Sequence, residues 1–374
     1  MNIAVLGAGM VGRVIATDLS KNHQVTSFDI NENNLILLNQ FPGITCKQAD
    51  LSTYDSYTGM LTGFDMVVSA VPGFMGYKTL ESIIKAGKDV VDISFFPENA
   101  LELHDLAMSK NVTAIVDCGV APGMSNLILG YYNTQMKISS FECMVGGLPK
   151  KRIKPFEYKA PFSPIDVLEE YTRPARYVEQ GQIVTKPALS DAELIDFEYA
   201  GTLESFNTDG LRSILHTMKH IPDMKEKTLR YPGHIHLIQS LQKAGFLDSK
   251  PIECKGQLVR PVDFTSALLF NQWKLEEGEA EFTIMKIVIR GTKDEKPMQV
   301  DYFLYDEYDR VTKTSSMSRT TGYTCTAAVN MVSEKVFSSK GVFPPELFGK
   351  DKKCFDFIMA YLQQRQVIYT CSIS

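Results

Sequence analysis

Three glycines close to the N-terminus are spaced as in a turn that binds a dinucleotide. The segment 7–12 reads Gly-Ala-Gly-Met-Val-Gly and lies between an apolar run, Asn2–Leu6, and a stretch of helical spacing, Met10–Leu19. In such a turn the first glycine permits the bend, the second lets a pyrophosphate approach the backbone, and the third lets the helix pack on the strand. The amides at the helix N-terminus then face the phosphates. We therefore expect a nucleotide site; a fold that has lost its nucleotide is the weaker interpretation.

An acidic side chain at the end of the second apolar run indicates which dinucleotide is bound. Asp29 directly follows the run Gln24–Phe28. Its separation from the glycines along the sequence is that of a carboxylate that binds the ribose hydroxyls. It would repel a 2′-phosphate and no arginine follows it directly, so the sequence favours NAD over NADP.

Two further places should border the dinucleotide. Asp50, after the third apolar run, is a candidate neighbour of the adenine or a helix cap. Small residues at 70–72 would let the nicotinamide-side ribose lie across the end of the fourth run. The expected cofactor-binding residues are Gly7, Gly9, Met10, Val11, Gly12, Asp29, Asp50, Ala70, Val71 and Pro72.

The elements that must position these residues alternate over the first third of the chain. Helical stretches such as Asn33–Gln40, Gly76–Ala86 and Asn99–Ser109 separate short apolar runs. Such runs are typical of strands buried on both faces, so the pattern predicts a doubly wound parallel sheet of the Rossmann type. The six expected strands are Asn2–Leu6, Gln24–Phe28, Ile44–Lys47, Asp65–Ala70, Asp89–Asp92 and Thr113–Asp117.

The rhythm changes after about residue 125. Three long alternating runs, Glu281–Arg290, Met298–Tyr305 and Val311–Ser318, predict an antiparallel meander, and Thr326–Phe337 has helical spacing. The fold class that we expect is α/β, with a Rossmann domain joined to an α+β domain built on an antiparallel sheet.

Composition excludes several classes of protein. The 374 residues carry 39 Lys+Arg against 44 Asp+Glu, a formal charge of -5, and neither sign runs in blocks. We therefore expect no nucleic-acid partner and no binding to anionic membranes. The apolar stretches are too short to span a bilayer. Seven scattered cysteines and the absence of metal-ligand spacing argue against a disulfide framework and a metal site, and favour a reduced, cytoplasmic compartment.

Several later motifs resemble those of the saccharopine dehydrogenase-like family, in order and over nearly the whole chain. The closest pattern is the lysine 6-dehydrogenase type, because residues 120–123 read Val-Ala-Pro-Gly and residue 234 is histidine. Residues 207–212 read Asn-Thr-Asp-Gly-Leu-Arg and depart from the His-Thr-Ser-Gly-Gly-Thr form of that type. Arg212 adds a cation that this form lacks. The motifs are Asp117–Asn126, Val145–Pro149, Leu203–Gly210, Thr228–His234 and Gly341–Glu346.

The resemblance implies a domain layout and an activity. Residues 1–123, completed by 326–374, would form the nucleotide domain, and residues 124–325 the substrate domain, through which members commonly pair as homodimers. The implied reaction is NAD-dependent oxidative deamination of an amino-acid ε-amine, from L-lysine to its 6-semialdehyde with release of ammonia. A saccharopine or carboxynorspermidine-type reductase is the nearest alternative, and a non-catalytic NAD-binding sensor is another.

Such an oxidation needs a carboxylate anchor and a base that leaves the amine neutral. Arg230 is the favoured anchor, because a guanidinium forks onto a carboxylate, and Arg212 is the competing one. A plain salt bridge at a strand end is the alternative role for Arg230. Thr208 and Asp209 are loop polar residues that could touch the amino-acid head group or simply shape a turn.

Three residues are candidates for the catalytic base or for holding the ammonium. His234 titrates near neutrality and could accept the ammonium proton, or it could be a structural hydrogen-bonding residue. Asp92 and Asp117 both end predicted parallel strands, at the edge where such sheets bind ligands. Either carboxylate could hold the ε-ammonium or cap the following helix.

Overall fold

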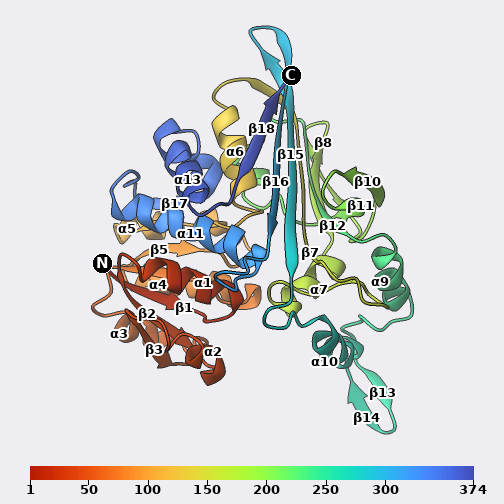
Figure 1. Ribbon diagram of the computed structural model, residues 1–374, viewed down its shortest axis with the longest axis horizontal. Coiled ribbons are helices and arrows are strands. Elements are labelled where there is room, and N and C mark those ends of the chain that lie inside the picture. The colour runs from red at the N-terminus through yellow and green to blue at the C-terminus, as the bar shows by residue number, and fades with distance from the viewer.

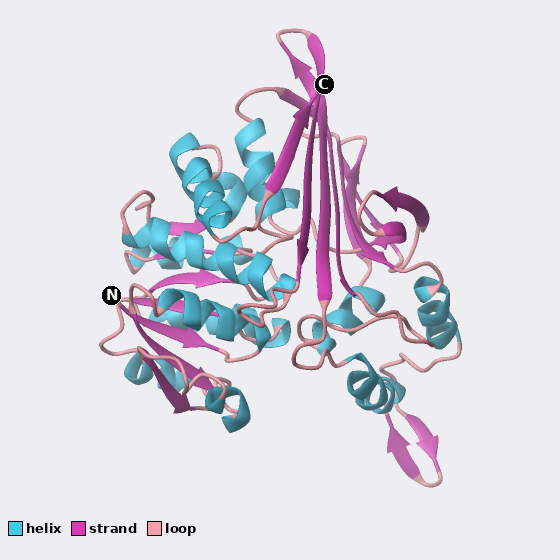
Figure 2. Ribbon diagram, viewed as in Figure 1, coloured by secondary structure: helices cyan, strands magenta, loops and turns pink.

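Two β-sheets organise the computed structural model, which describes residues 1–374 apart from the side chains of Pro164 and Ile165 (Figures 1 and 2). The first sheet has seven parallel strands in the order β17-β6-β5-β4-β1-β2-β3. The six strands predicted at the N-terminus are all present in it, and the Rossmann prediction is confirmed. The strands are β1 (Asn2–Leu6), β2 (Gln24–Asp29), β3 (Ile44–Gln48), β4 (Met66–Ser69), β5 (Asp89–Asp92), β6 (Thr113–Ile115) and β17 (Gly341–Phe343).

Helices cover both faces of this sheet. Alternate residues of β1 point to opposite sides: Ile3 and Val5 join the core under α1, whereas Ala4 and Leu6 join the core under α4. Fully buried strands of this kind carry no polar alternation, which is why they are continuous apolar runs in the sequence. The helices and 3-10 turns of this part are α1 (Met10–Leu19), α2 (Glu32–Ile36), η1 (Tyr54–Ser56), α3 (Tyr57–Met60), α4 (Gly73–Lys85), η2 (Ala100–Leu103) and α5 (His104–Ser109).

The second sheet has nine strands and is mixed. Its main path runs β10-β11-β12-β7-β15-β16-β18, with β8 on β12 and β9 on β8. The expectation of an antiparallel sheet is corrected at one place, because β12 runs parallel to β7. The strands are β7 (Lys137–Pro149), β8 (Ala175–Glu179), β9 (Gln182–Lys186), β10 (Glu193–Phe197), β11 (Gly201–Asn207), β12 (Asp223–Arg230), β15 (Glu281–Lys293), β16 (Lys296–Glu307) and β18 (Tyr369–Ile373).

Five helices and a small hairpin belong to the same half of the chain. The hairpin β13–β14 and the helix before β15 extend away from the rest of the molecule at the lower right of Figure 1. These elements are α6 (Met124–Tyr132), α7 (Pro164–Thr172), α8 (Ile214–Thr217), α9 (His234–Lys243), β13 (Ile252–Cys254), β14 (Gln257–Val259) and α10 (Pro261–Trp273).

The C-terminal region is divided between the two sheets. The helix α11 (Ser316–Ser333) packs on α1, and β17 extends the parallel sheet beside β6. Two further helices follow, α12 (Pro345–Phe348) and α13 (Lys352–Gln364). The last strand, β18, pairs with β16 in the second sheet, which differs from the division expected for 326–374. In Figure 1 the blue helix α11 therefore lies beside the red helix α1, while the chain end lies on the other sheet.

One expected strand is wrong, and one helix begins earlier than expected. The stretch Val311–Ser318 is a loop that leads into α11, which begins at Ser316 rather than Thr326. The cause is the buried Glu281, whose carboxyl group accepts the backbone N–H groups of Ser316 (2.9 Å) and Met317 (2.8 Å). A carboxylate at the first turn satisfies free amides and complements the helix dipole, so the helix starts there.

Candidate functional site

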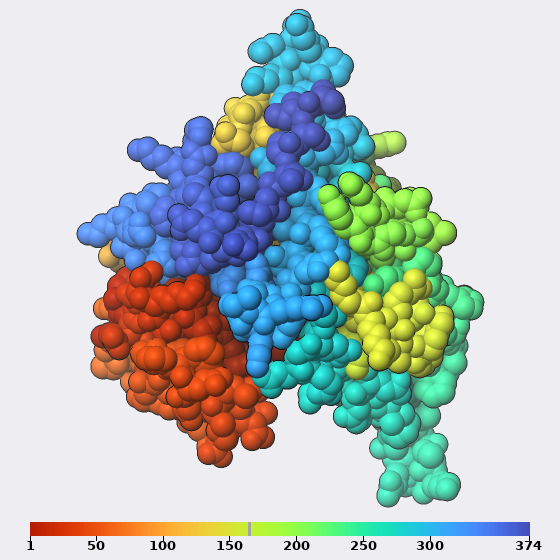
Figure 3. All heavy atoms as spheres, in the orientation of Figure 1, coloured from red at the N-terminus to blue at the C-terminus, as the bar shows by residue number. Residues whose placement is uncertain are grey.

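A cavity of about 1470 Å³ separates the parallel sheet from the second sheet. Its walls come from the glycine turn after β1 and the ends of β2, β4 and β6 on one side, and from β7, β12, α7 and the segment 308–321 on the other. Figure 3 shows the molecule hollowed where the red N-terminal residues face the teal and cyan segments of the second half. All ten residues predicted to bind the cofactor line this cavity.

At two positions of the glycine turn, a side chain would clash with the backbone. Gly7 has φ +103°, and a Cβ atom there would lie 2.4 Å from the carbonyl oxygen of Ala70. A Cβ at Gly12 would lie 2.0 Å from the carbonyl oxygen of Gly7, whereas Gly9 faces open space. Gly9 is also the N-cap of α1, so the free amides of that helix open into the cavity. The residues present therefore fit a dinucleotide pyrophosphate.

Asp29 lies at the end of β2 and faces the same cavity. Its Oδ2 accepts the backbone N–H of Ala8 at 2.7 Å, and its Oδ1 accepts the backbone N–H of Asn31 at 2.8 Å. These bonds hold the carboxylate against the glycine turn, where a ribose would lie. Asp50 also lines the cavity, and its Oδ1 accepts both the backbone N–H (2.9 Å) and the hydroxyl (2.6 Å) of Ser52.

The substrate side of the cavity is built on one face of β12. Glu226, Thr228 and Arg230 line the cavity at intervals of two residues, as the alternation of a strand requires. Thr208, just after β11, also lines it, and its hydroxyl lies 3.0 Å from that of Thr228. An acid, two hydroxyls and a guanidinium thus follow one another along this wall.

Arg230 is held by four protein groups. Its Nε donates to the Tyr171 hydroxyl (2.9 Å), Nη1 to the Leu229 carbonyl (3.0 Å), and Nη2 to Glu170 (2.8 Å) and to the Tyr158 hydroxyl (3.4 Å). The residue is buried but borders the cavity. Arg230 therefore forms a salt bridge with Glu170 and also faces the cavity, and its role as a carboxylate anchor stays a prediction.

His234 is not among the residues that line the cavity. Its Nε2 lies 2.9 Å from the Tyr171 hydroxyl, and its Nδ1 lies 2.9 Å from the Phe156 carbonyl oxygen. Burial, and then the charge of Arg230, lower the pKa of the imidazole to about 3. The structure places His234 behind Tyr171, as a neutral hydrogen-bonding residue, and does not bring it together with Arg230 in one cleft.

Asp117 and Arg212 form a buried ion pair, with Nε 2.6 Å from Oδ1. Asp117 lines the cavity, whereas Arg212 lies behind it and stacks on the rings of Phe95 (5.0 Å) and Phe96 (4.8 Å). Both residues have positive φ, 53° for Asp117 and 46° for Arg212. Arg212, the cation of the 207–212 loop, is therefore paired with Asp117, one of the acids predicted to lie in the site.

Asp209 and Asp92 have protein partners of their own. Asp209 lines the cavity and accepts two bonds of 2.8 Å from the Arg176 guanidinium. Asp92 is fully buried, accepts the Ser94 hydroxyl at 2.9 Å and is not among the lining residues. Burial raises its pKa to about 7. The geometry makes Asp209 a structural acid and keeps Asp92 away from a bound substrate.

The acids that line the cavity but were not predicted from the sequence include Asp166 and Glu226. Asp166 in α7 accepts the backbone N–H of Gly73 at 3.2 Å, and burial raises its pKa to about 6. Glu226 is buried in β12, and burial raises its pKa to about 8. The sequence carries one usable signal for Glu226, which is its even spacing from Thr228 and Arg230 along a strand. Asp166 has none, because helix α7 meets Gly73 only in the folded protein.

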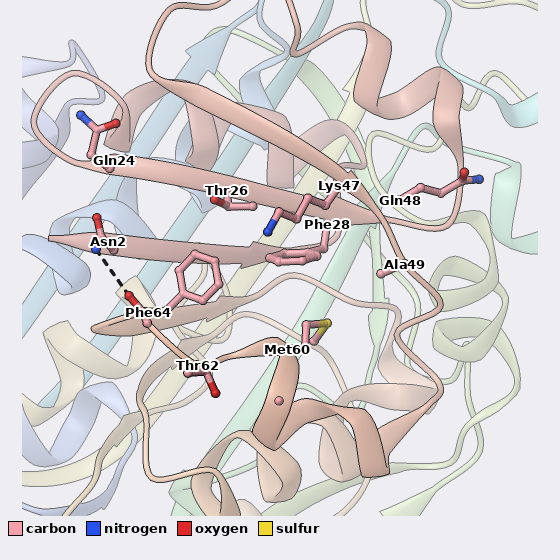
Figure 4. A pocket seen from close by; sticks show the side chains of 12 residues that line it. Asn2, Gln24, Thr26, Phe28, Lys47, Gln48, Ala49, Met60, Thr62 and Phe64 are labelled. Atoms are coloured by element: carbon pink, nitrogen blue, oxygen red, sulfur yellow. Dashed lines mark hydrogen bonds between the residues drawn. The ribbon is translucent and has the colours of Figure 1, made fainter.

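A second, smaller cavity of about 570 Å³ lies on the outer surface of β1, β2 and β3 (Figure 4). Phe28 and Phe64 pack edge to face along it, and Asn2 donates to the Gly63 carbonyl at 3.4 Å. It lies apart from the glycine turn, and none of the predicted site residues lines it.

The described residues contain no cluster of His, Cys, Asp and Glu suited to a metal ion. None of their helices has the length and apolar character needed to cross a membrane.

Two sequence families match this chain and together cover almost all of it. The saccharopine dehydrogenase NADP binding domain matches residues 3–115, and the saccharopine dehydrogenase C-terminal domain matches residues 119–368. The chain belongs to the saccharopine dehydrogenase family. Members of that family are NAD(P)-dependent oxidoreductases, and the glycine turn lies within the part of the chain that the NADP binding domain matches.

Named relatives in the saccharopine dehydrogenase family are distant. The α-aminoadipic semialdehyde synthase of Arabidopsis thaliana is 26% identical over 219 residues, which are 54% of this chain and 20% of that protein. This chain therefore spans about a fifth of that relative's length. The carboxyaminopropylagmatine dehydrogenase of Synechocystis is 20% identical over 381 residues, 93% of each protein.

Solved structures with the same fold include two enzymes. The L-glutamate-forming saccharopine dehydrogenase of Saccharomyces cerevisiae superposes with a TM-score of 0.80 at 20% identity, covering 100% of this chain and 99% of that one. The homospermidine synthase of Legionella pneumophila, in complex with NAD, gives 0.65 at 12% identity, covering 100% and 91%. These likenesses establish the family fold.

Proposed function

We propose that this family member uses NAD to oxidise the ε-amine of an amino acid, and that L-lysine is converted to its 6-semialdehyde with release of ammonia. The observation that carries the proposal is the charge of the substrate side of the cavity. Acids there outnumber the cations available to a ligand, which favours a substrate that brings positive charge. Arg230 borders the cavity and is the proposed anchor for a carboxylate, whereas Arg212, the competing candidate, lies behind Asp117.

Each of the four arginines around the substrate side already forms an ion pair with an acidic side chain of the protein. Arg230 pairs with Glu170 (2.8 Å), Arg176 with Asp209 (2.8 Å), and Arg212 with Asp117 (2.6 Å). The fourth pair joins Arg173 and Glu169. Asp166 and Glu226 have no cationic partner among the residues that the structure describes, so a substrate ammonium would complete the balance of charge.

Asp29 supports NAD as the cofactor. Its carboxylate is fixed by two backbone amides beside the glycine turn, where it can accept the ribose hydroxyls. A 2′-phosphate at this place would meet a negative charge. Bound NAD would supply the hydride acceptor of the reaction.

One alternative reaction has its own support. The Synechocystis carboxyaminopropylagmatine dehydrogenase matches over 93% of its length, and its name describes an agmatine derivative. A reductase that joins an amine to a semialdehyde, of the saccharopine or carboxynorspermidine type, would also use the unpaired acids. The non-catalytic NAD sensor predicts nucleotide binding without turnover of any amine.

The test is a spectrophotometric screen of the purified chain. NADH formation is followed with lysine, ornithine, saccharopine, diamines and agmatine derivatives, with NAD and NADP in parallel. Ammonia release with lysine supports the proposal. Oxidation of a secondary amine alone would favour the reductase type, and NADH binding without turnover would favour the sensor.

We also propose a homodimer in a reducing, cytoplasmic compartment. The outer face of the second sheet carries stacked aromatic rings, among them Tyr199 and Tyr305 at 5.3 Å, and Tyr199 is exposed. Light scattering measures the mass of the particle. All seven cysteines are free, as expected of a reducing environment.

A further inference from the structure

Glu226 is an acid in the cavity wall that no protein group neutralises. It lies in the middle of β12, beside Cys143 of the parallel strand β7, and only 5% of its surface is exposed. Its side chain borders the cavity two residues from Thr228 and four from Arg230. None of the hydrogen bonds or ion pairs found among the described residues involves its carboxyl oxygens. A buried carboxyl group without a partner is costly and marks a functional position.

The backbone next to Glu226 is shaped around its carboxyl group. A Cβ atom at Gly210 would lie 1.7 Å from Oε1 and 2.3 Å from Oε2. Any larger residue at this place in the loop after β11 would therefore displace the carboxyl group from its present position. The position of the acid is set by the loop and by the strand together.

The four charged groups around Glu226 come from three parts of the chain. They are Glu170 of α7, Asp209 and Arg212 of the 207–212 loop, and Asp117 after β6. Burial raises the pKa of Glu226 most, the three acids raise it further, and Arg212 opposes them; the result is about 8. The group can thus bind and release a proton in the range where amine dehydrogenation must deprotonate an ammonium.

We propose that Glu226 is the catalytic base that takes the proton from the substrate ammonium, an inference that rests on the proposed function. One N–H bond of the R–CH2–NH3⁺ group breaks, and its proton passes to the Glu226 carboxylate. The nitrogen lone pair then forms the C=N bond as the C–H hydride leaves to the bound nicotinamide dinucleotide. Water converts the resulting iminium to the aldehyde and ammonium, and Glu226 returns its proton to solvent.

The other acids of the site are less suited to this role. Asp117 is bound to Arg212 at 2.6 Å, and Asp166 accepts the Gly73 backbone N–H at 3.2 Å. Asp92 and His234 do not line the cavity. Glu226 is the buried lining acid of the substrate side whose oxygens have no donor among the described residues.

The test compares Glu226→Gln with a matched control, Glu142→Gln. Gln keeps the shape of Glu, so the contact with Gly210 is preserved. Glu142 lies on the adjacent strand, pairs with Lys225 at 3.1 Å and does not line the cavity. With the amine that the wild-type chain oxidises, we expect Glu226→Gln to lower kcat by about 100-fold or more. The fall of kcat/KM below pH 8 should disappear, while the NADH dissociation constant stays within twofold. Glu142→Gln should match the wild type in all three measurements.

A second variant separates a chemical role from a structural one. Glu226→Ala leaves space beside Gly210, and added formate should restore part of its activity if a carboxylate base is what was lost. Wild-type kinetics and pH profile in Glu226→Gln would overturn the role of Glu226 while the proposed function stands. So would a Glu226→Ala variant that formate does not rescue while Asp166→Asn abolishes the pH dependence. Absence of turnover in the wild type with every amine tested would overturn the proposed function itself, and this inference with it.

Discussion

At the scale of single residues, a chain of hydrogen bonds determines what His234 can do. The Arg230 Nε–H donates to the Tyr171 oxygen, so the Tyr171 O–H is left to donate to His234 Nε2. The His234 Nδ1–H then donates to the Phe156 carbonyl. Only a neutral imidazole with its proton on Nδ1 satisfies this chain. His234 is therefore best described as a positioning residue for Arg230.

Replacing His234 by Phe tests this role. The ring volume among Tyr158 and Trp273 is kept, but the acceptor for Tyr171 is lost. A lost buried hydrogen bond costs about 1–3 kcal/mol, so we expect KM for the amine to rise about tenfold or more. The pH dependence of kcat/KM should not change, and the exposed neighbour His236→Phe should behave as the wild type. If the variant instead loses the ionisation from its pH profile, His234 is the base.

The carboxylate of Asp29 should determine the cofactor preference. In Asp29→Ser the acceptor for the ribose hydroxyls is lost and so is the repulsion of a 2′-phosphate. We expect NADH to bind about tenfold more weakly and NADPH to bind at least as well as before, since one charge-assisted hydrogen bond contributes about 1.5–3 kcal/mol. Fluorescence titration measures both affinities. A wild-type chain that prefers NADPH would contradict the role given to Asp29.

At the scale of elements, the 207–212 loop and the end of β6 depend on each other. Their contact is the buried pair of Arg212 and Asp117, and both residues adopt a left-handed backbone conformation that few side chains favour. Such conformations persist when surrounding contacts hold them. The pair connects the nucleotide sheet to the wall that carries the substrate residues.

Breaking this pair should destabilise the fold more than any surface ion pair does. Arg212→Met leaves Asp117 buried and unpaired, which costs about 3–5 kcal/mol in comparable cases. Urea unfolding measures the loss, and the double variant Arg212→Met with Asp117→Asn should recover part of it. Lys225→Met, which removes the half-exposed pair with Glu142, should cost less than about 1 kcal/mol. Equal losses of unfolding free energy in Arg212→Met and Lys225→Met would show that the buried pair stabilises the fold no more than the surface pair does.

The sequence predicts elements well where local patterns determine them. The six buried strands and α1 follow from apolar runs and from the glycine turn, and all are confirmed. The start of α11 could not be predicted, because Glu281, which caps it, is distant in the sequence. The parallel pairing of β12 with β7 is also non-local, and Glu226 was missed because its environment exists only after that pairing.

At the scale of the whole molecule, several buried acids hold protons more tightly in the folded state. Burial raises the pKa of Asp92, Glu281 and Glu346 to about 7 and that of Glu226 to about 8. In the unfolded chain the same groups release their protons near pH 4. Between pH 6.5 and 8.5 the folded protein therefore loses protons that the unfolded chain has already lost, and its stability falls as the pH rises.

Thermal unfolding of the ligand-free protein should show this trend. We expect a Tm lower by about 2–5 °C at pH 8.5 than at pH 6.5. His234, whose pKa is lowered to about 3, acts in the opposite sense, but only below its unfolded pKa of about 6.5. The Glu346→Gln variant should show a smaller decrease. A Tm that rises over this range would mean that these acids are ionised in the folded state.

The position of β17 in the parallel sheet affects how the chain can fold while it is being synthesised. β6 is complete at Ile115, but the strand that covers its outer side is Gly341–Phe343. A growing polypeptide on the ribosome thus carries an open strand edge while every strand of the second sheet except β18 is made. Open edges invite pairing with other chains, so we expect nascent molecules of this protein to need chaperone protection until nearly the last residue is added.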